Sequence, residues 1–157
     1  MHQQIKASPD DTAQNMRTVV DALAAAGINV EAIAPDFDPP HVRVLVKHKP
    51  DYKEDDPTDP FNRALEALRG VGLEPTTVRS ADPVRMKNEP GALKIAMDTI
   101  ENAGHALDSI LVLPAAQGNY AVVSFGVVGQ IDEGWAEEAV VLSTLIEQAI
   151  WGGEDIQ

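Results

Sequence analysis

Apolar residues in the first part of the chain recur every three or four positions. Between residues 12 and 27 they fall at Met16, Val20 and Leu23 and end at Gly27, which predicts one face of a helix that stops at a glycine. Acidic and hydroxyl side chains precede this segment and suit the start of a helix. The pattern therefore predicts an early amphipathic helix.

Strict alternation of apolar and polar residues predicts strands before and after this helix in the sequence. It occurs in residues 28–33 and 41–48, which are separated by the turn-rich residues 36–40. Residues 4–7 are a shorter candidate for an opening strand. We therefore expect a strand, a helix and then a hairpin.

After a polar loop at residues 49–60, a second helical period appears at Phe61, Leu65 and Leu68, and residues 74–79 are a short strand candidate. The first half thus has the order βαββαβ. The order then restarts, with predicted strands at residues 84–87, 107–113 and 120–128, a helix opened by residues 88–91, and a last helix through Trp135, Ala139, Leu142, Ile146 and Ala149. No good closing strand follows, because residues 152–157 are few and polar.

The two halves match at a constant offset. Gly27 and Gly104, which end the first helix of each half, lie 77 residues apart. The same offset keeps the apolar–polar pattern for about thirty residues, which favours a duplication with modules at residues 1–80 and 81–157. The superposed pairs are Met16 with Leu93, Val20 with Met97, Leu23 with Ile100, Val30 with Leu107, Glu31 with Asp108, Ile33 with Ile110, Val44 with Ala121, Leu45 with Val122 and Val46 with Val123.

Composition narrows the classes of partner. The 157 residues are 44% hydrophobic, which is enough for a core, and 4% aromatic, so the core must be mainly aliphatic. Twelve basic and 25 acidic residues give a net charge of −13, which repels nucleic acid and anionic membranes. The acidity suits a high-salt cytoplasm and an ordinary acidic protein equally.

The chain has no cysteine, so thiolate chemistry and disulfides are absent. It has no signal-peptide core and no apolar run long enough to span a membrane, and we expect a soluble cytoplasmic protein. His41 and His48 lie seven residues apart on one predicted strand, so their side chains face opposite sides and do not form a metal site. Residues 51–59 lack the glycine and the final glutamate of a calcium-binding loop. We therefore expect a solvated acidic loop, no metal, no cofactor and no enzyme.

One segment carries a family resemblance. The run Asn88-Glu89-Pro90-Gly91-Ala92-Leu93, followed by Ile100, Gly104 and the strand at residues 107–113, resembles the ACT domain. The likeness covers residues 83–150 by motif and residues 1–80 by the order of elements. It implies two ferredoxin-like modules, each an antiparallel four-stranded sheet with two helices on one face, whereas residues 152–157 leave the second module without an evident last strand. It also implies side-by-side sheet pairing and a ligand site, often for an amino acid, between modules.

The residues of this turn suit such a site. A helix start offers unpaired N–H groups and partial positive charge for a carboxylate, and Gly91 allows close approach of a ligand. Pro90 suits a first helical turn, and Asn88 suits either a helix cap or a ligand's polar groups. The same residues also make a good helix start without any ligand. Residues 11–14, their counterpart, lack the glycine and carry acid.

Across the module interface, the first hairpin strands supply candidates for an ammonium group, although these positions also fit plain solvent-facing residues. The full expected ligand site is Asn88, Glu89, Pro90, Gly91, Ala92, Leu93, Asn29, Val30, Glu31, Leu107, Asp108 and Ser109. We expect a non-catalytic regulatory module that binds a small ligand and modulates a partner protein. The alternative is a structural interaction module with no ligand. Either residues 152–157 form a poor last strand, or another element or a second subunit completes that sheet edge, and we therefore also expect a homo-oligomer.

Overall fold

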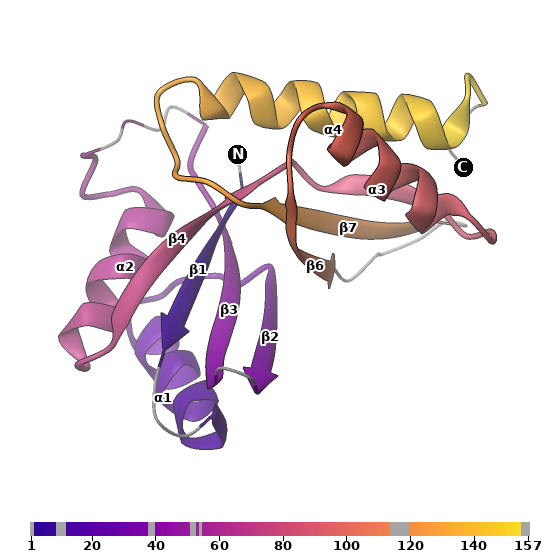
Figure 1. The fold of residues 1–157 in the computed structure, drawn as a ribbon. Helices are drawn as coiled ribbons and strands as arrows, with labels where there is room; N and C mark the ends of the chain where they lie inside the picture. Colours follow the sequence, from indigo (N-terminus) through magenta and orange to yellow (C-terminus); the bar gives the residue numbers. More distant parts are fainter. Residues whose placement is uncertain are drawn as a thin grey trace. The chain divides into compact units, whose positions relative to one another are not determined.

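The structure, a computed structural model, describes residues 2–8, 12–37, 40–50, 53, 55–113 and 120–154 (Figure 1). The chain divides into two compact units, an N-terminal unit of residues 1–78 and a C-terminal unit of residues 79–157. Helices and antiparallel strands make up both units, so the fold class is α+β as predicted.

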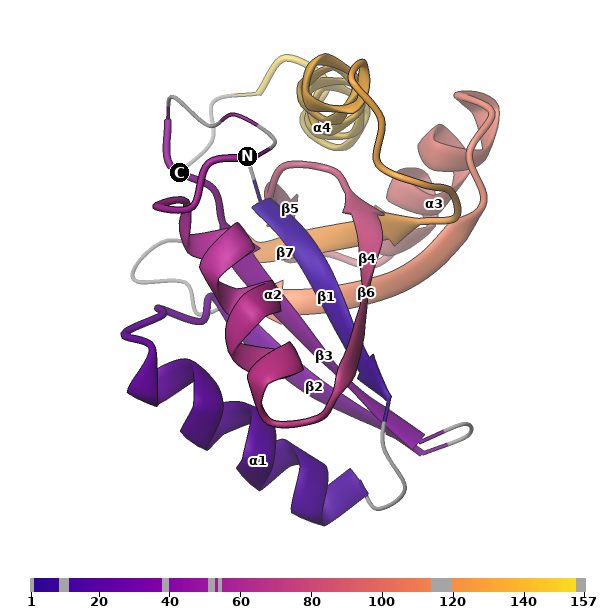
Figure 2. The ribbon, with the colours of Figure 1, turned by 90° about the vertical axis from the view of Figure 1, so that its left-hand side faces the viewer.

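The N-terminal unit follows the predicted βαββαβ order. Its strands pair antiparallel in the order β2-β3-β1-β4, so that Ile5 of β1 lies between Val44 of β3 and Thr77 of β4. Helices α1 and α2 cover one face of this sheet (Figure 2). The elements are β1 (His2–Ser8), α1 (Thr12–Ala25), β2 (Ala32–Phe37), β3 (Pro40–Lys47), α2 (Pro60–Gly70) and β4 (Glu74–Ser80), the last of which ends inside the C-terminal unit.

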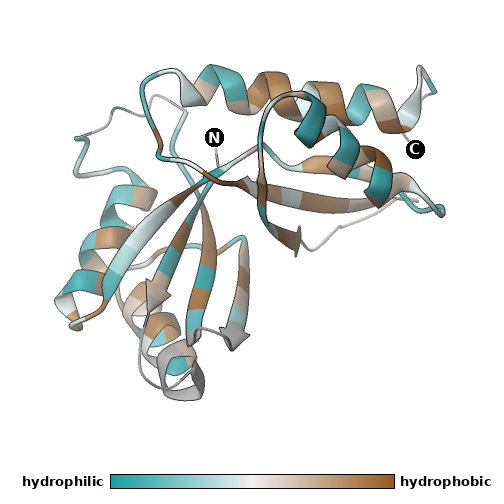
Figure 3. Ribbon diagram, in the orientation of Figure 1, coloured by the Kyte–Doolittle hydropathy of each residue, from teal (hydrophilic) through white to brown (hydrophobic). Residues whose placement is uncertain are grey.

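The core of this unit lies between the sheet and the two helices. Val42, Val44 and Val46 of β3 are fully buried in this core, Leu45 is fully buried as well, and Figure 3 shows apolar and polar bands along the strand. Each large aliphatic side chain removed from water contributes roughly 1.5–3 kcal/mol. The buried face of α1 is centred on Val19 and Leu23, whereas Val20, predicted to face the core, is 43% exposed. Met16 and Leu23 of the predicted face do pack against the core, so the prediction is wrong for Val20 alone.

The predicted strand at residues 28–33 is wrong at both ends. Strand β2 begins at Ala32 and runs to Phe37, into residues predicted as a turn. The reason is that Ile28 still belongs to the end of α1: its N–H donates to the Leu23 carbonyl at 2.9 Å and its side chain is buried in the core. The chain can join β3 only after this turn is complete.

The C-terminal unit repeats the first five elements of the same order. Its strands are β5 (Val84–Lys87), β6 (Leu107–Leu113) and β7 (Tyr120–Val127), and its helices are α3 (Ala92–Asn102) and α4 (Trp135–Trp151). Strand β7 pairs antiparallel with β5 and with β6, and residues 79–80 of β4 also pair with it. In the described chain, which reaches residue 154, no strand follows α4, so the predicted loss of the last strand is confirmed there.

The core of this unit contains both tryptophans of the chain and Phe125. Phe125 and Trp135 are buried beside aliphatic residues of β5, β7 and α4. Helix α3 turns small residues inward, Ala92 and Ala96, together with Ile100, while Leu93 is 44% exposed and not in the predicted core face. None of the helices in the described residues is both long and apolar enough to cross a membrane.

The ends of the two first helices match at the predicted offset. Gly27 and Gly104 both have positive φ, 70° and 87°. The residue after each glycine donates its N–H back into the helix, Ile28 to Leu23 at 2.9 Å and His105 to Ile100 at 3.2 Å. A glycine in this left-handed conformation ends a helix with such a bond, so the two glycines have the same role.

The offset does not hold through the hairpins. In the N-terminal unit Ala32 pairs with Leu45, and the offset of 77 would pair Ser109 with Val122. Instead Ser109 pairs with Gly126, four residues further along. The predicted superposition of Val44–Val46 on Ala121–Val123 is therefore wrong, because the second hairpin holds extra residues before β7.

Helix α4 occupies the edge of β5 where a fourth strand would pair. The Arg85 N–H donates to Glu147 Oε1 at 3.0 Å, and the indole N–H of Trp151 donates to the Arg85 carbonyl at 2.8 Å. The Arg85 guanidinium also binds Glu147, with Nη2 to Oε2 at 2.9 Å. Both outward backbone groups of Arg85 are thus satisfied within the chain.

This finding corrects the argument from the missing strand. Exposed strand edges invite pairing with another chain because their N–H and C=O groups lack partners. At Arg85 those groups have partners from α4. The edge of β5 therefore gives no reason to expect a homo-oligomer, and any such reason must come from another surface.

The edge contact yields a testable expectation. Trp151→Phe keeps an aromatic ring but removes the donor to the Arg85 carbonyl, so the free energy of unfolding should fall by about 1–3 kcal/mol in urea titration. Glu147→Ala removes the acceptor of the Arg85 N–H, so this amide should exchange with deuterium faster while the amides of β7 keep their protection. Unchanged stability and unchanged exchange would show that α4 does not close the edge.

Candidate functional site

The turn between β5 and α3 holds the predicted ligand motif. Asn88, Glu89, Pro90 and Gly91 are all exposed. Gly91 is the N-cap of α3 with φ 90° and ψ −13°, and no side chain hydrogen-bonds to the helix start. Asn88 is therefore not a cap, and Pro90 precedes the helix and does not lie in its first turn. The Ala92 N–H makes a long hydrogen bond of 3.4 Å to the Glu89 carbonyl, and no side chain caps the first turn of α3.

Charges of both signs surround this turn. The Lys87 ammonium lies 3.4 Å from Glu89 and 2.5 Å from Glu154, and 5.7 Å from the centre of the Trp151 ring. The hydrogen bond to Glu154 raises the pKa of Lys87, so the ammonium is retained. A helix start also carries partial positive charge. The turn thus offers cationic and anionic groups within a few residues, an arrangement suited to a zwitterion.

The remaining predicted site residues do not gather at this turn. Leu107 pairs with Val127 at one end of β7, whereas Lys87 pairs with Tyr120 at its other end, so the predicted residues 107–109 lie at the opposite end of the same sheet. Within the motif itself, Ala92 is buried and Leu93 is exposed.

The predicted residues Asn29, Val30 and Glu31 belong to the N-terminal unit. Asn29 is exposed, and Val30 and Glu31 are half-buried. The Glu31 N–H donates to the Leu45 carbonyl at 2.9 Å, which places this segment at the entry to β2. These three residues are therefore partly accessible. They belong to a different unit from the motif at residues 88–93.

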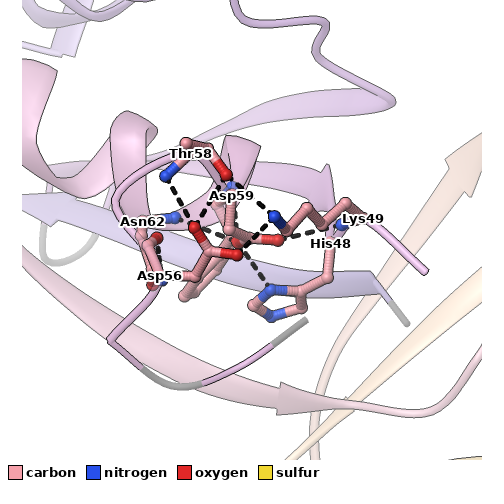
Figure 4. A network of polar contacts seen from close by, with 7 residues as sticks. His48, Lys49, Asp56, Thr58, Asp59 and Asn62 are labelled. Atoms are coloured by element: carbon pink, nitrogen blue, oxygen red, sulfur yellow. Dashed lines mark hydrogen bonds and ion pairs between the residues drawn. The ribbon is translucent and has the colours of Figure 1, made fainter. Parts of the chain in front are cut away.

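A buried polar network in the N-terminal unit was not predicted as such (Figure 4). The His48 Nδ1 lies 2.8 Å from Asp59 Oδ2, and the two side chains are 2% and 0% exposed. Asp59 is the N-cap of α2 and also accepts the N–H groups of Lys49, Phe61 and Asn62, at 2.9, 3.0 and 3.2 Å. The carboxylate thus joins the end of β3 to the start of α2.

The burial of this pair decides its chemistry. Desolvation lowers the pKa of His48 and outweighs the opposing effect of Asp59, so the imidazole is neutral and its Nδ1–H donates to the carboxylate. A histidine–carboxylate pair resembles a general-base arrangement. A ring only 2% exposed, packed at 4.6 Å against Phe61, gives no access to a substrate. We therefore assign the pair a structural role.

The exposed part of the network involves Asp56. Its side chain accepts from the Thr58 N–H and hydroxyl, at 2.9 and 2.7 Å, and pairs with Lys49. The hydrogen bond from Lys49 comes first among the causes that lower the pKa of Asp56 to about 2. The predicted solvated acidic loop is thus wrong for Asp59, which is buried, whereas Asp56 is half-buried and Asp55 is exposed; residues 51, 52 and 54 lie outside the described chain. The role of Asp59 could have been predicted from the sequence, because aspartate followed by proline is a typical pair for the N-cap and first residue of a helix.

Three comparisons with known proteins place the fold. No family model and no curated protein sequence matches the chain. The regulatory subunit of aspartate kinase from Thermus thermophilus, in a ligand-free form, matches with a TM-score of 0.57 and 21% identity over 94% of this chain and 92% of that chain. The regulatory subunit from Thermus flavus matches with a TM-score of 0.56 and 23% identity over the same shares, 94% and 92%.

A third solved structure, the aspartate kinase of Clostridium acetobutylicum, matches with a TM-score of 0.59 and 10% identity over 95% of this chain and 32% of that chain. These likenesses confirm the predicted fold class, α+β with ferredoxin-like modules. Among the described residues, no group of three or more His, Asp or Glu side chains is placed to hold a metal ion.

The His48–Asp59 pair predicts a pH dependence of stability. Because the folded state lowers the pKa of His48 from its ordinary 6.5, the unfolded chain binds a proton first as the pH falls. Stability should be intact above pH 6.5 and be lost below it, toward the lowered folded-state pKa. His48→Asn supplies a neutral amide donor to Asp59 that does not titrate. Urea titrations from about pH 7.5 to 5.5 should therefore show a shallower loss in the variant, and equal slopes would contradict a buried neutral His48.

Proposed function

We propose that this chain is a cytoplasmic, non-catalytic regulatory protein with ACT-like domains at residues 1–80 and 81–157, which binds a free amino acid and modulates a partner protein. The observation that carries the proposal is the exposed, uncapped start of α3 at Gly91, with Lys87 and Glu89 beside it. The shared fold supports it, since two of the similar structures are named as regulatory subunits.

The chemistry of the turn matches an amino acid. The carboxylate accepts the first N–H groups of α3 and is attracted by Lys87, while the ammonium meets Glu89. Gly91, with no atom within 4 Å of an added Cβ, leaves room for close approach. Asn29, Val30 and Glu31 or Leu107, Asp108 and Ser109, supplied by a neighbouring module, remain the proposed second half of the site.

Such a ligand regulates only if it prefers one state of the protein. Binding at Gly91 must be tighter in one conformation or assembly than in another, because a ligand shifts an equilibrium by its difference in affinity. The Lys87–Glu89–Glu154 contacts are exposed ion pairs that rearrange at low cost. A ligand that replaces them would change how the turn and the end of α4 are held together.

The second candidate function is a self-associating interaction module, and one observation favours it. Strand β6 is an edge strand over Leu107–Leu113 in the described chain, with Asp108 as its single charged residue. Ile110 and Val112 are 38% and 66% exposed. Long apolar edge strands without charges pair readily with a copy of themselves. We propose that β6, and not β5, carries the expected homo-oligomerisation.

The amino-acid proposal is tested by thermal melting with each free L-amino acid in turn. A ligand at about one hundred times its dissociation constant should stabilise the chain by about 2.7 kcal/mol. Gly91→Ala should abolish this shift, because a Cβ occupies the space the ligand needs. The absence of a shift with every amino acid would rule out this ligand class.

A matched control separates ligand contact from backbone strain. Gly104 also has positive φ, 87°, and open space around an added Cβ. Gly104→Ala should therefore cost a similar amount of stability, about 1–2 kcal/mol, yet keep the ligand-induced shift. Equal loss of the shift in both variants would mean that Gly91 acts through folding alone.

Self-association through β6 is tested by light scattering. Val112→Lys places a charge on the edge strand and should convert the oligomer to a monomer. Val128→Lys, at a similarly exposed valine of the same unit (60%), should leave the oligomer intact. A wild-type chain that is monomeric at every concentration would refute pairing through β6.

A further inference from the structure

Helix α4 has a second apolar side that faces away from the core. Its outer stripe, Val140, Val141, Thr144 and Leu145, lies on one side of the helix, because residues three and four apart are neighbours there. The valines are 52% and 50% exposed and the leucine 42%. The Thr144 hydroxyl donates to the Val140 carbonyl at 2.8 Å, so the helix backbone engages its polar atom.

The opposite side of α4 is the one that packs in the C-terminal unit. Ala139, Leu142 and Ile146 are fully buried, as is Trp135 at the start of the helix. Apolar residues therefore lie on more than one side of α4, and Figure 3 shows apolar and polar bands alternating along the helix. A helix with a single apolar stripe would bury that stripe and expose polar residues elsewhere. The outer stripe is thus the part of α4 that still requires a partner.

The surroundings of the outer stripe are acidic. Glu137 and Glu138 lie in the first turn of α4, and Asp132 and Glu133 precede it. From Val128 to Gln157 the sequence contains no Lys, Arg or His. Glu133 and Glu137 have no ion pair in the part of the chain that the structure describes, so the field at the start of α4 is negative.

The basic residues of the C-terminal unit do not offset this field. Each of its four Lys and Arg residues lies in an ion pair with a carboxylate. The pairs are Arg79 with Asp132 at 2.9 Å, Arg85 with Glu147 at 2.9 Å, Lys87 with Glu154 at 2.5 Å and Lys94 with Asp98 at 2.7 Å. Acidic side chains thus remain in excess around α4.

Charge complementarity selects the occupant of the outer stripe. A second copy would bring Glu137, Glu138 and the preceding acids of one chain against the same residues of the other, in a protein of net charge −13. We propose that the outer stripe docks an amphipathic helix of a partner protein, with Lys or Arg residues flanking its apolar side. This deepens the proposed regulation of a partner and rests on that function, but it uses residues outside the amino-acid turn.

The test uses the full chain and fluorescent peptides of about 18 residues. One peptide has Leu at helical spacings of three and four and Lys elsewhere, a second replaces Lys by Glu, and a third has the Leu/Lys composition without the spacing. Anisotropy titration should show at least about tenfold tighter binding of the first peptide. Equal binding of the scrambled peptide would reduce the contact to non-specific charge attraction and overturn the proposal.

Variants of the chain decide whether the outer stripe is the site. Val141→Ser with Leu145→Ser should weaken binding of the amphipathic basic peptide by about tenfold. Val71→Ser with Val128→Ser, at other exposed valines (47% and 60%), should not. Unchanged binding to the stripe variant overturns the proposal. So does a stripe variant whose mass by light scattering falls from dimer to monomer, since a second copy would then cover the stripe.

The amino-acid melting shift, measured on the same stripe variant, distinguishes the two proposals. A retained shift with lost peptide binding supports a ligand turn and a separate docking helix. A lost shift in the wild-type chain with every amino acid, together with stripe-dependent peptide binding, refutes the amino-acid site and leaves the docking surface standing.

Discussion

The backbone groups at the edge of β5 must find partners although the C-terminal unit has no fourth strand in its described residues. Helix α4 supplies them: Glu147 accepts the Arg85 N–H and Trp151 donates to the Arg85 carbonyl. These bonds fix where α4 ends, and so they hold Glu154 beside Lys87 at the candidate turn. They also commit one side of α4 to the sheet and leave its outer stripe exposed. The closed edge of β5 and the position of Glu154 beside the candidate turn therefore depend on the same contact.

The N-terminal unit satisfies the same topology by a different route. It has its fourth strand, β4, and needs no helix at that edge. Its own constraint is the junction of β3 with α2, where the buried Asp59 carboxylate accepts backbone N–H groups and the ring N–H of His48. An ionised carboxylate tolerates such burial only when several donors surround it. The two halves share an order of elements and differ in what holds the elements together.

Local signals in the sequence predicted the elements well. Helical and strand periods located the four helices and most strands, and Gly27 and Gly104 marked equivalent helix ends, because a left-handed helix stop needs glycine. The outcome at Val20 and Leu93, both exposed, shows the limit of this argument. A periodic pattern allows neighbouring faces of a helix, and only packing against a particular sheet selects one of them.

The candidate site was likewise predictable from the sequence only in part. Chain order alone placed Asn88–Gly91 at the start of a helix, so the turn was predictable. The separation of Leu107–Ser109 from it depends on strand register, which is set by the length of the second hairpin and by pairing along β7. The His48–Asp59 bond and the bonds of Arg85 to α4 join residues far apart in sequence. The sequence by itself determined the elements, their order and the exposed turn. The tertiary structure decided which residues meet, because contacts between distant segments depend on register and packing that no local pattern encodes.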